Sequence, residues 1–459
     1  WPNRREAATL GTSMLLLLAV LSLLPAVLAG GRPAAELWPL LPGLAIRFSV
    51  EPLGMLFACV AAVLWPINSL YSIGYMRGNR EGHQTRFYVC FAIALSAALG
   101  VAFAGNLLTL FVFYEILTLS TYPLVAHKGT PEAMRGGRLY LGMLIGTSVG
   151  LLFPAMLWTW NAAGTLDFAP GGILAGRLEG PAVGLLLALY MFGIGKAALM
   201  PFHRWLPAAM VAPTPVSALL HAVAVVKAGV FTVMKVTVYI FGVDFLAETG
   251  ASWWLAWVAA FTLLAASVVA LTQDNLKARL AYSTVSQLAY VVLGAALANA
   301  MGVMGGAMQI AMHAFGKITL FFCAGAIYTA ARRTEISQMD GLGRAMPLTY
   351  AAFLIGALSV AGLPPLGGTW SKWFLLLGAA DAGQWLLMAV LTVSTLLNVG
   401  YLLAVPARGF FLPAADAPHA VREAPLLCVL PPCLTALGCV LLFFCADAMY
   451  ALLKPLTTP

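Results

Sequence analysis

Long apolar stretches, separated by short polar segments, run along the whole chain. The hydrocarbon core of a bilayer is about 30 Å thick, and roughly 20 helical residues cross it. Thirteen stretches of that length are present, which predicts an all-α polytopic membrane protein. They lie near residues 8–29, 47–75, 83–104, 106–126, 137–160, 183–209, 214–241, 252–272, 280–300, 302–330, 346–378, 385–405 and 425–452.

The composition supports lipid as the solvent. Hydrophobic residues make up 61% of the 459 residues and charged residues only 9%, whereas soluble proteins carry roughly 25% charged residues. The net charge of +8 does not indicate nucleic-acid binding, because the basic residues stand singly in short loops. The seven cysteines have no paired spacing, so we expect neither disulfides nor a metal site. The sequence has no phosphate-binding loop, nucleophile–base pair or haem motif, so we expect no cofactor and no catalytic residue.

The two sides of the predicted bundle differ in basic residues. Segments on the side of the N-terminus carry 16 of the 25 Lys and Arg, and segments on the opposite side carry 4. Because positively charged loops stay cytoplasmic, we expect the N-terminus in the cytoplasm of a bacterium or archaeon, with the protein in the inner or plasma membrane.

The first predicted span follows Arg4 and Arg5, as a signal peptide would. It is long for a signal peptide and lacks a clear cleavage site of small residues, so we interpret it as a retained span. The chain begins at Trp1 instead of Met, and we expect a further N-terminal segment.

Prolines interrupt two of the predicted spans, the sixth within 196–201 and the eleventh within 362–368. If spans three to seven and spans eight to twelve form two five-helix units, each break falls in the fourth helix of its unit. Because five is odd, the units have opposite orientations, and inverted repeats with broken helices are typical of transporters. The predicted parts are N-terminal transmembrane helices (1–82), a first five-helix proton-channel unit (83–241), an inverted second unit (252–405) and a C-terminal transmembrane helix (406–459).

Several ionisable residues lie at mid-membrane depth. A charge there costs at least ~2.5–3.5 kcal/mol on insertion scales, so its repetition indicates function. The residues are Glu115, Lys196, Lys227, His313, Lys317 and Lys372. Structural ion pairing is the alternative, but a single glutamate neutralises one lysine at most. We expect the other lysines to exchange protons instead of serving as fixed charges, which indicates a proton path.

Other ionisable residues allow two interpretations each. His313 and Lys317 are four residues apart and share a helix face, although a core histidine with satisfied hydrogen bonds is the alternative for the first. His221 is equally consistent with the path and with structural hydrogen bonding. Lys235 is either an exit group or a lysine whose ammonium reaches the headgroups. Glu51 is either a helix-start acid or an exit group.

At these residues the sequence resembles the antiporter-like subunits shared by multisubunit monovalent cation/proton antiporters, respiratory complex I and membrane-bound hydrogenases. The D-type subunit of the antiporters is the most similar. The resemblance extends from about residue 47 to about residue 405 and rests on long motifs. They are Leu110–Glu115, Gly195–Pro207, Ala212–His221, Leu280–Gln287, His313–Lys317, and Gly362–Pro365 followed by Lys372.

The resemblance implies a fourteen-helix fold with two inverted five-helix repeats, so we expect 13–14 transmembrane helices, two of them broken. It implies that Glu115 and Lys196 form a pair that couples to a neighbouring subunit. It further implies that Lys227 and Lys317 are central relay positions and that Lys372 ends the path. The implied partners are other membrane subunits of a hetero-oligomeric complex, the lipid bilayer, protons and, as an alternative coupling ion, Na⁺.

The function expected from this is a proton-translocating, D-type subunit of a multisubunit cation/proton antiporter. Two alternatives stay open. One is a proton-pumping membrane subunit of a complex I-like NADH-quinone oxidoreductase or membrane-bound hydrogenase, whose electrons flow in other chains. The other is a membrane subunit of an inorganic-carbon uptake complex. A scaffold that conducts nothing is the structural interpretation.

Overall fold

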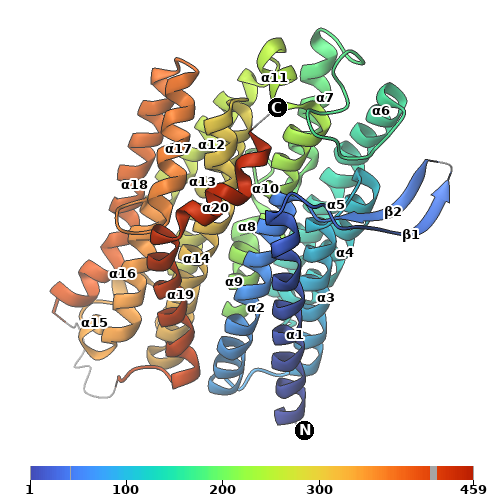
Figure 1. Cartoon of the computed structure of the whole chain (residues 1–459). Coiled ribbons are helices and arrows are strands. Elements are labelled where there is room, and N and C mark those ends of the chain that lie inside the picture. Colours follow the sequence, from blue (N-terminus) through green and yellow to red (C-terminus); the bar gives the residue numbers. More distant parts are fainter. Residues whose placement is uncertain (1, 42, 414–420, 458–459) are drawn as a thin grey trace.

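The computed structural model is a bundle of helices that lie side by side (Figure 1). It describes residues 2–41, 43–413 and 421–457. Within these ranges ten helices are long and apolar enough to cross a membrane, so the predicted all-α polytopic membrane fold is confirmed. The other predicted spans are formed by α7, by α13, and by α16 together with α17.

Two parts of the sequence interpretation fall outside these ranges. Trp1, on which the expected N-terminal segment rests, is not among the described residues, nor are residues 414–420 and 458–459 of the predicted C-terminal part.

The helical bounds are α1 (Pro2–Leu28), α2 (Pro52–Gly78), α3 (Gln84–Ala102), α4 (Leu107–Val125), α5 (Pro131–Thr147), α6 (Phe153–Ala163), α7 (Pro181–Gly193), α8 (Trp205–Ala208), α9 (Thr214–Ala218), α10 (Val225–Val236), α11 (Val243–Thr249), α12 (Trp253–Thr272), α13 (Leu276–Ala296), α14 (Ala300–Ala331), α15 (Leu342–Ala345), α16 (Pro347–Ala361), α17 (Gly368–Asp381), α18 (Trp385–Phe411), α19 (Leu426–Phe444) and α20 (Ala446–Leu453).

Short π-helical and 3₁₀ segments interrupt or join these helices. Three π-helical segments keep two long spans continuous, because α5 continues into α6 and α9 continues through α10. The π-helical segments are η1 (Ser148–Leu152), η4 (Leu219–Val223) and η5 (Thr237–Phe241). The 3₁₀ segments are η2 (Gly195–Ala197), η3 (Ala209–Val211), η6 (Ile336–Gln338) and η7 (Lys454–Leu456).

The first proline break lies between α7 and α8. Helix α7 ends at Gly193, and the 3₁₀ turn η2 carries Lys196 at the start of the break. Ala198 then takes a left-handed conformation with φ +52°. Pro201, which follows a cis peptide bond, has no backbone N–H with which to continue a helix. The chain becomes helical again only at Trp205.

The second break separates α16 from α17. Helix α16 ends at Ala361, and Gly362 adopts φ +85°, a left-handed conformation that favours glycine. Pro364 and Pro365, joined by a cis peptide bond, keep the chain non-helical until Gly368. Both predicted broken helices are therefore present. The inverted relation of the two units remains a prediction.

A β-hairpin was not predicted. Strands β1 (Ala34–Leu41) and β2 (Leu44–Ser49) pair in antiparallel fashion and project sideways from the bundle (Figure 1). The expected start of the second span at residue 47 is therefore wrong, because the helix begins at Pro52. The alternation of apolar and polar residues in Leu44–Ser49 is typical of a strand, but this short segment adjoins a long apolar stretch that obscures it.

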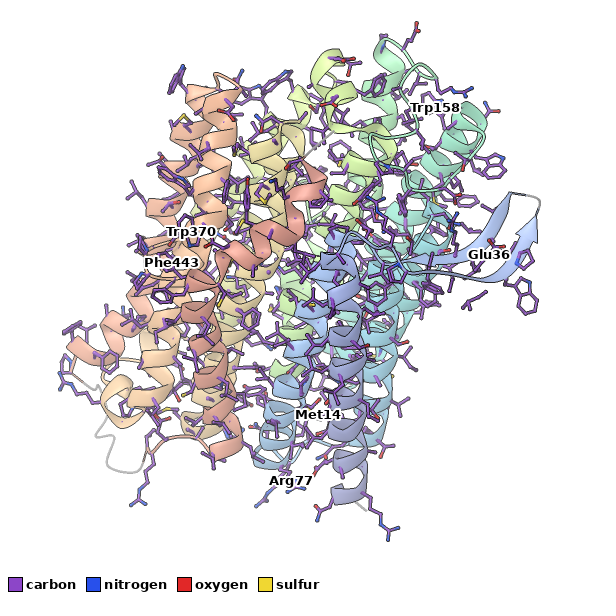
Figure 2. The ribbon with its side chains drawn as sticks, viewed as in Figure 1. Met14, Glu36, Arg77, Trp158, Trp370 and Phe443 are labelled. Atoms are coloured by element: carbon purple, nitrogen blue, oxygen red, sulfur yellow. The ribbon has the colours of Figure 1, made fainter. Side chains whose placement is uncertain are left out.

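Two spans form the enclosed centre of the bundle. All residues of Thr214–Phe241, the span that contains α10, are buried, and α14 is nearly as enclosed. These two spans pack against each other and against α2 and α13, and α14 also contacts α16, α17 and α19. Outer helices instead expose apolar side chains, among them Met14 of α1 (Figure 2), as lipid-facing surfaces do.

A glycine allows α10 to approach the first break. A Cβ atom at Gly229 would lie 2.4 Å from the carbonyl carbon of Lys196 and 2.4 Å from the amide nitrogen of Ala197. Both are backbone atoms, so no side-chain rotation relieves the overlap. The missing side chain at this position therefore sets the distance between the central span and the turn that carries Lys196.

We expect Gly229→Ala to destabilise the protein by about 1–3 kcal/mol, as overpacking does. Thermal unfolding of the detergent-purified protein, followed by tryptophan fluorescence, measures this as a lower melting temperature. Gly146→Ala is the matched control, because a Cβ atom there meets no atom within 4 Å and alanine favours the helix. Equal melting temperatures for the two variants would contradict the close approach.

Candidate functional site

A hydrogen bond between two buried ionisable side chains lies at the centre of the bundle. The Nζ atom of Lys227, on α10, is 2.7 Å from Nδ1 of His313, on α14. Lys227 is 0% exposed and His313 2%. These residues lie in different predicted five-helix units, so the contact joins the two units directly.

The polar contacts continue from His313 along α14. Lys317, one helical turn further, donates from Nζ to Oγ of Ser283 at 2.6 Å. The Ser283 hydroxyl is also within hydrogen-bond distance of the Tyr401 hydroxyl at 3.0 Å, and Tyr401 donates to the amide oxygen of Asn398. Helices α13, α14 and α18 thereby share one buried polar cluster.

Lys372 lies on α17 just beyond the second break. Its Nζ atom donates to the carbonyl of Ala361 at 2.8 Å and to Oγ1 of Thr395 at 3.4 Å. It also lies 4.6 Å from the centre of the Tyr290 ring. The last carbonyls of a helix lack partners within the helix, so the end of α16 at the break supplies an acceptor for the ammonium group.

Lys196 is held by α4 at the first break. Its Nζ atom donates to the carbonyl of Tyr114 at 2.9 Å and to Oγ1 of Thr118 at 2.5 Å. The same atom lies 3.1 Å from the centre of the Tyr114 ring. The side chain is fully buried, so two oxygens and an aromatic face replace water around the charge.

Glu115 is close in sequence to these partners but is not bonded to Lys196. No ion pair joins the two among the described residues, and both carboxylate oxygens of Glu115 are buried without a hydrogen-bond partner there. Its neighbours Ile116 and Leu119 are exposed, so this side of α4 faces outward. The expected Glu115–Lys196 pair is open in this structure.

His221 and Lys235, for which the sequence allowed two interpretations each, lie in different surroundings. His221 lies in the π-helical segment η4 and is completely buried. Its ring packs 4.8 Å from that of Phe321, and neither ring nitrogen has a partner among the described residues. Lys235 does not reach the headgroups, because it is 0% exposed and forms an ion pair with Glu51 at 3.1 Å.

Polar side chains that the sequence analysis did not single out connect α13, α14 and α17. Gln309 donates from Nε2 to Oε1 of Gln287 at 2.8 Å, and Ser371 donates to Oε1 of Gln309 at 2.5 Å. Ser283 and Gln287 belong to the motif Leu280–Gln287 and are one turn apart, so they share a helix face. This shared face was the sequence signal from which both residues could have been identified.

Several polar atoms buried at the site have no partner in the described part of the protein. In the described part of the chain no group of three or more His, Cys, Asp or Glu side chains is placed to hold a metal ion. The polar atoms without a partner there include both ring nitrogens of His221 and Nε2 of His313. Buried polar atoms are normally hydrogen-bonded to protein or to water, and lysine and histidine exchange protons through such contacts.

Sequence comparison relates the chain to membrane subunits of two kinds of complex. The family model described as NADH:quinone oxidoreductase/Mrp antiporter, TM, matches residues 104–398. NADH-quinone oxidoreductase subunit N of Desulforudis audaxviator is 33% identical over 393 residues, which is 85% of this chain and 77% of the relative. The A/B subunit of a probable K(+)/H(+) antiporter of Rhizobium meliloti is 30% identical over 399 residues, which is 84% of this chain and 39% of the relative.

Other relatives are longer than this chain. NAD(P)H-quinone oxidoreductase chain 5 of Synechocystis sp. is 31% identical over 355 residues, which is 72% of this chain but only 49% of the relative. The chain therefore spans about half the length of such relatives. The range 104–398 matched by the family model contains Glu115, Lys196, Lys227, His313, Lys317 and Lys372.

Solved structures with the same fold are known. A chain of the Mrp complex from Dietzia sp. superposes with a TM-score of 0.88 at 22% identity and covers 99% of this chain and 92% of its own length. A chain of the membrane-bound sulfane sulfur reductase, an archaeal respiratory membrane complex, superposes with a TM-score of 0.86 at 25% identity, with coverages of 98% and 91%.

We expect Gln309→Leu to lower the melting temperature of the purified protein. The leucine leaves the carbonyl oxygen of Gln287 and the hydroxyl of Ser371 buried without this partner, and an unsatisfied buried polar group costs about 1–3 kcal/mol. Thr392→Ala is the control, because the Thr392 hydroxyl is exposed and donates to the carbonyl of Met388 in its own helix. A melting temperature equal to that of the control would show that the buried chain of hydrogen bonds contributes nothing.

Proposed function

Because this chain belongs to the NADH:quinone oxidoreductase/Mrp antiporter membrane family, we propose that it moves protons through its buried ionisable residues. It is an antiporter-like, multi-pass membrane subunit, and its relatives are subunits of larger membrane complexes. The observation that carries the proposal is the contact between Lys227 and His313 at 2.7 Å. It is a direct contact between one ionisable residue of each predicted unit.

In the proposed path, protons enter from the cytoplasmic side, along the second span of each unit, and reach the central pair, Lys227 and His313. They continue to Lys317, whose partner Ser283 connects to Tyr401. They then reach Lys372 at the second break. Water molecules bridge the intervals that the protein contacts do not, because several polar atoms near the path, including Nε2 of His313, lack a protein partner among the described residues.

The pair Glu115–Lys196 is the proposed gate. The ammonium of Lys196 is fixed by Tyr114 and Thr118 in this structure, and closing the pair requires it to swing to Glu115. At an effective dielectric near 20, moving a charge from ~4 Å to ~8 Å changes its interaction by about 2 kcal/mol. That is about thirtyfold in a protonation equilibrium, enough to drive a proton from one neighbour to the next.

The outward side of α4 offers a place for coupling. Glu115 lies there with an unpartnered carboxylate, between exposed apolar residues. A neighbouring membrane subunit that places a cation at this depth would draw Glu115 away from Lys196. Removal of that cation would release Glu115 again. The gate of this chain would then respond to the state of its neighbour.

We assign the chain to the D-type subunits of cation/proton antiporters, on the motifs that include Gly195–Pro207 and His313–Lys317. The relatives include both quinone oxidoreductase and antiporter subunits, so co-purification is the decisive observation. Small membrane subunits alone support the antiporter. Flavin and iron–sulfur proteins would place the chain in a redox-driven pump instead, and carbonic-anhydrase-like partners in an inorganic-carbon uptake complex.

We expect Lys196→Ala and Glu115→Gln each to lower proton transport at least tenfold, because each removes one half of the gate. Transport by the complex is measured in inside-out membrane vesicles with a pH-sensitive dye, at equal amounts of assembled complex. Arg135→Ala on the exposed start of α5 is the control. Full transport by both gate variants would support a non-conducting scaffold and overturn the proposed path.

We expect the loop between α4 and α5 on the cytoplasmic side and α11 on the opposite side. Lys128→Cys and Glu248→Cys place thiols at exposed positions of these segments. A membrane-impermeant maleimide applied to intact cells should label Glu248→Cys above the background of the native cysteines, and Lys128→Cys only after permeabilisation. The reverse pattern would invert the proposed topology.

A further inference from the structure

A buried ion pair joins the residue before α2 to the central span, eight positions beyond Lys227. Glu51 precedes α2, and Lys235 is in the last turn of α10. Their carboxylate and ammonium groups are 3.1 Å apart, with both side chains almost completely buried. Neither residue has a role in the path described above.

Each group of the pair has further partners. The ammonium of Lys235 donates to the carbonyl of Ala104 at 2.7 Å and lies 4.5 Å from the centre of the Phe168 ring. The second carboxylate oxygen of Glu51 accepts a hydrogen bond from Tyr239. A buried ion pair persists only when such bonds compensate for lost water, and this cluster is built to keep both charges.

A small cavity leads from the pair toward the surface. Its volume is about 60 Å³, enough for a few water molecules. Glu51, Lys235 and Tyr239 line its inner part, and Arg47 and Asp167 line its outer part. Arg47, on strand β2, forms an ion pair with Asp167 at 3.2 Å, and both side chains are nearly half exposed.

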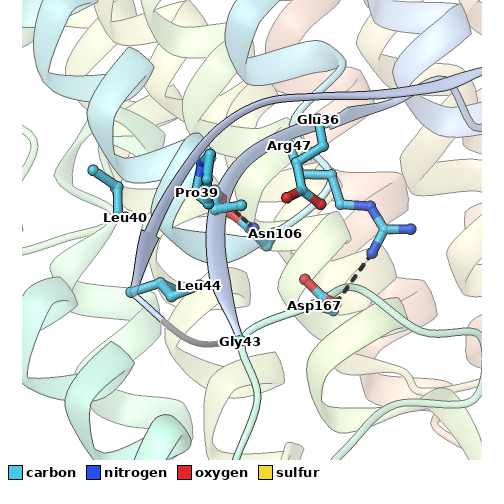
Figure 3. A pocket seen from close by; sticks show the side chains of 9 residues that line it. Glu36, Pro39, Leu40, Gly43, Leu44, Arg47, Asn106 and Asp167 are labelled. Atoms are coloured by element: carbon cyan, nitrogen blue, oxygen red, sulfur yellow. Dashed lines mark hydrogen bonds and ion pairs between the residues drawn. The ribbon is translucent and has the colours of Figure 1, made fainter.

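The cavity adjoins a larger cleft under the hairpin. This cleft has a volume of about 570 Å³ and shares Arg47 and Asp167 with the small cavity. Figure 3 shows the ion pair of Arg47 and Asp167 beside Glu36 and Asn106 below the curved strands. A surface ion pair therefore stands between the buried pair and the open cleft.

An apolar layer separates this cluster from the central lysine. Phe231 lies four residues from both Lys227 and Lys235 along α10, and its ring packs 5.1 Å from that of Phe57 on α2. The lysines are eight positions apart, which corresponds to about 12 Å along a helix. Hydrophobic constrictions of this kind open and close to ions by wetting and drying.

We propose that Glu51 and Lys235 form the outer proton-release site of the first unit, which opens under the β-hairpin. The ammonium of Lys227 loses a proton, which crosses the Phe57–Phe231 layer when water enters it, and the carboxylate of Glu51 accepts it. The protonated Glu51 then releases the proton into the cleft past the Arg47–Asp167 pair. Lys235 keeps its charge throughout and draws Glu51 back to the ionised form. The inference rests on the proposed proton transport.

The test compares Glu51→Gln with the double variant Glu51→Gln/Lys235→Met in the assembled complex. The glutamine keeps the shape of the side chain and an oxygen that accepts from Tyr239, but it has no carboxylate that can take up and release a proton. We expect it to lower proton transport in vesicles at equal amounts of complex, with a residual rate through the branch that leads to Lys317 and Lys372. The double variant contains no unpaired charge, so assembly and melting temperature should recover while transport stays low.

The outcomes separate a release site from a structural pair. Recovery of transport by the double variant would show that the pair serves stability alone and would overturn the proposal, as would full transport by Glu51→Gln. Glu6→Gln is the matched control, because Glu6 is a buried acid paired with Arg77 at the opposite end of α2, and it should transport normally. If Glu115→Gln abolishes transport and Glu51→Gln does not, the release site fails while the proposed function stands.

Discussion

The cost of an ionised side chain at membrane depth is the constraint on which this structure depends. A lysine ammonium in hydrocarbon has no partner, so each must be surrounded by protein oxygens, nitrogens or aromatic faces. The fold meets this need by placing the lysine-bearing spans at its centre. The span Thr214–Phe241 is buried along its whole length, and the outer helices that face lipid carry Leu, Ile and Phe instead.

The two helix breaks are part of the same solution. The end of α16 at Gly362 leaves the carbonyl of Ala361 without a helical partner, and this carbonyl accepts from Lys372. At the first break the 3₁₀ turn brings Lys196 against α4, where Gly229 on the central span makes room for it. Non-helical backbone at membrane depth is tolerated where protein or a water-filled cavity covers it; the first break packs against Gly229 of the central span, whereas Pro364 and Pro365 of the second are exposed.

The ionisable groups differ in how tightly they are held, and this difference suggests how a proton moves. The ammonium groups of Lys235 and Lys372 have hydrogen-bond acceptors in the protein, whereas both ring nitrogens of His221, Nε2 of His313, the carboxylate of Glu115 and one carboxylate oxygen of Glu51 lack a hydrogen-bond partner among the described residues. Groups with spare hydrogen-bonding capacity exchange protons with water most readily. The central contact between Lys227 and His313 is therefore a pair in which one ring nitrogen of the histidine is bonded to protein and the other is available.

The sequence by itself determined the features that depend on a single segment of the chain. Apolar length predicted the spans, prolines predicted both broken helices, and depth along each span predicted the burial of Lys196, Lys227, His313, Lys317 and Lys372, although Glu115 is only partly buried. The sequence did not predict the β-hairpin, because its six-residue second strand adjoins a long apolar stretch.

Only the tertiary structure decided which buried groups meet, because a residue's depth in its own helix does not say which neighbour it faces. Lys227 meets His313, which is 86 residues away in the chain, and Lys196 meets Tyr114 and Thr118 instead of Glu115. Lys235 meets Glu51, which is 184 positions earlier in the chain. These pairings follow from how helices pack around one another, and that packing is a property of the whole bundle.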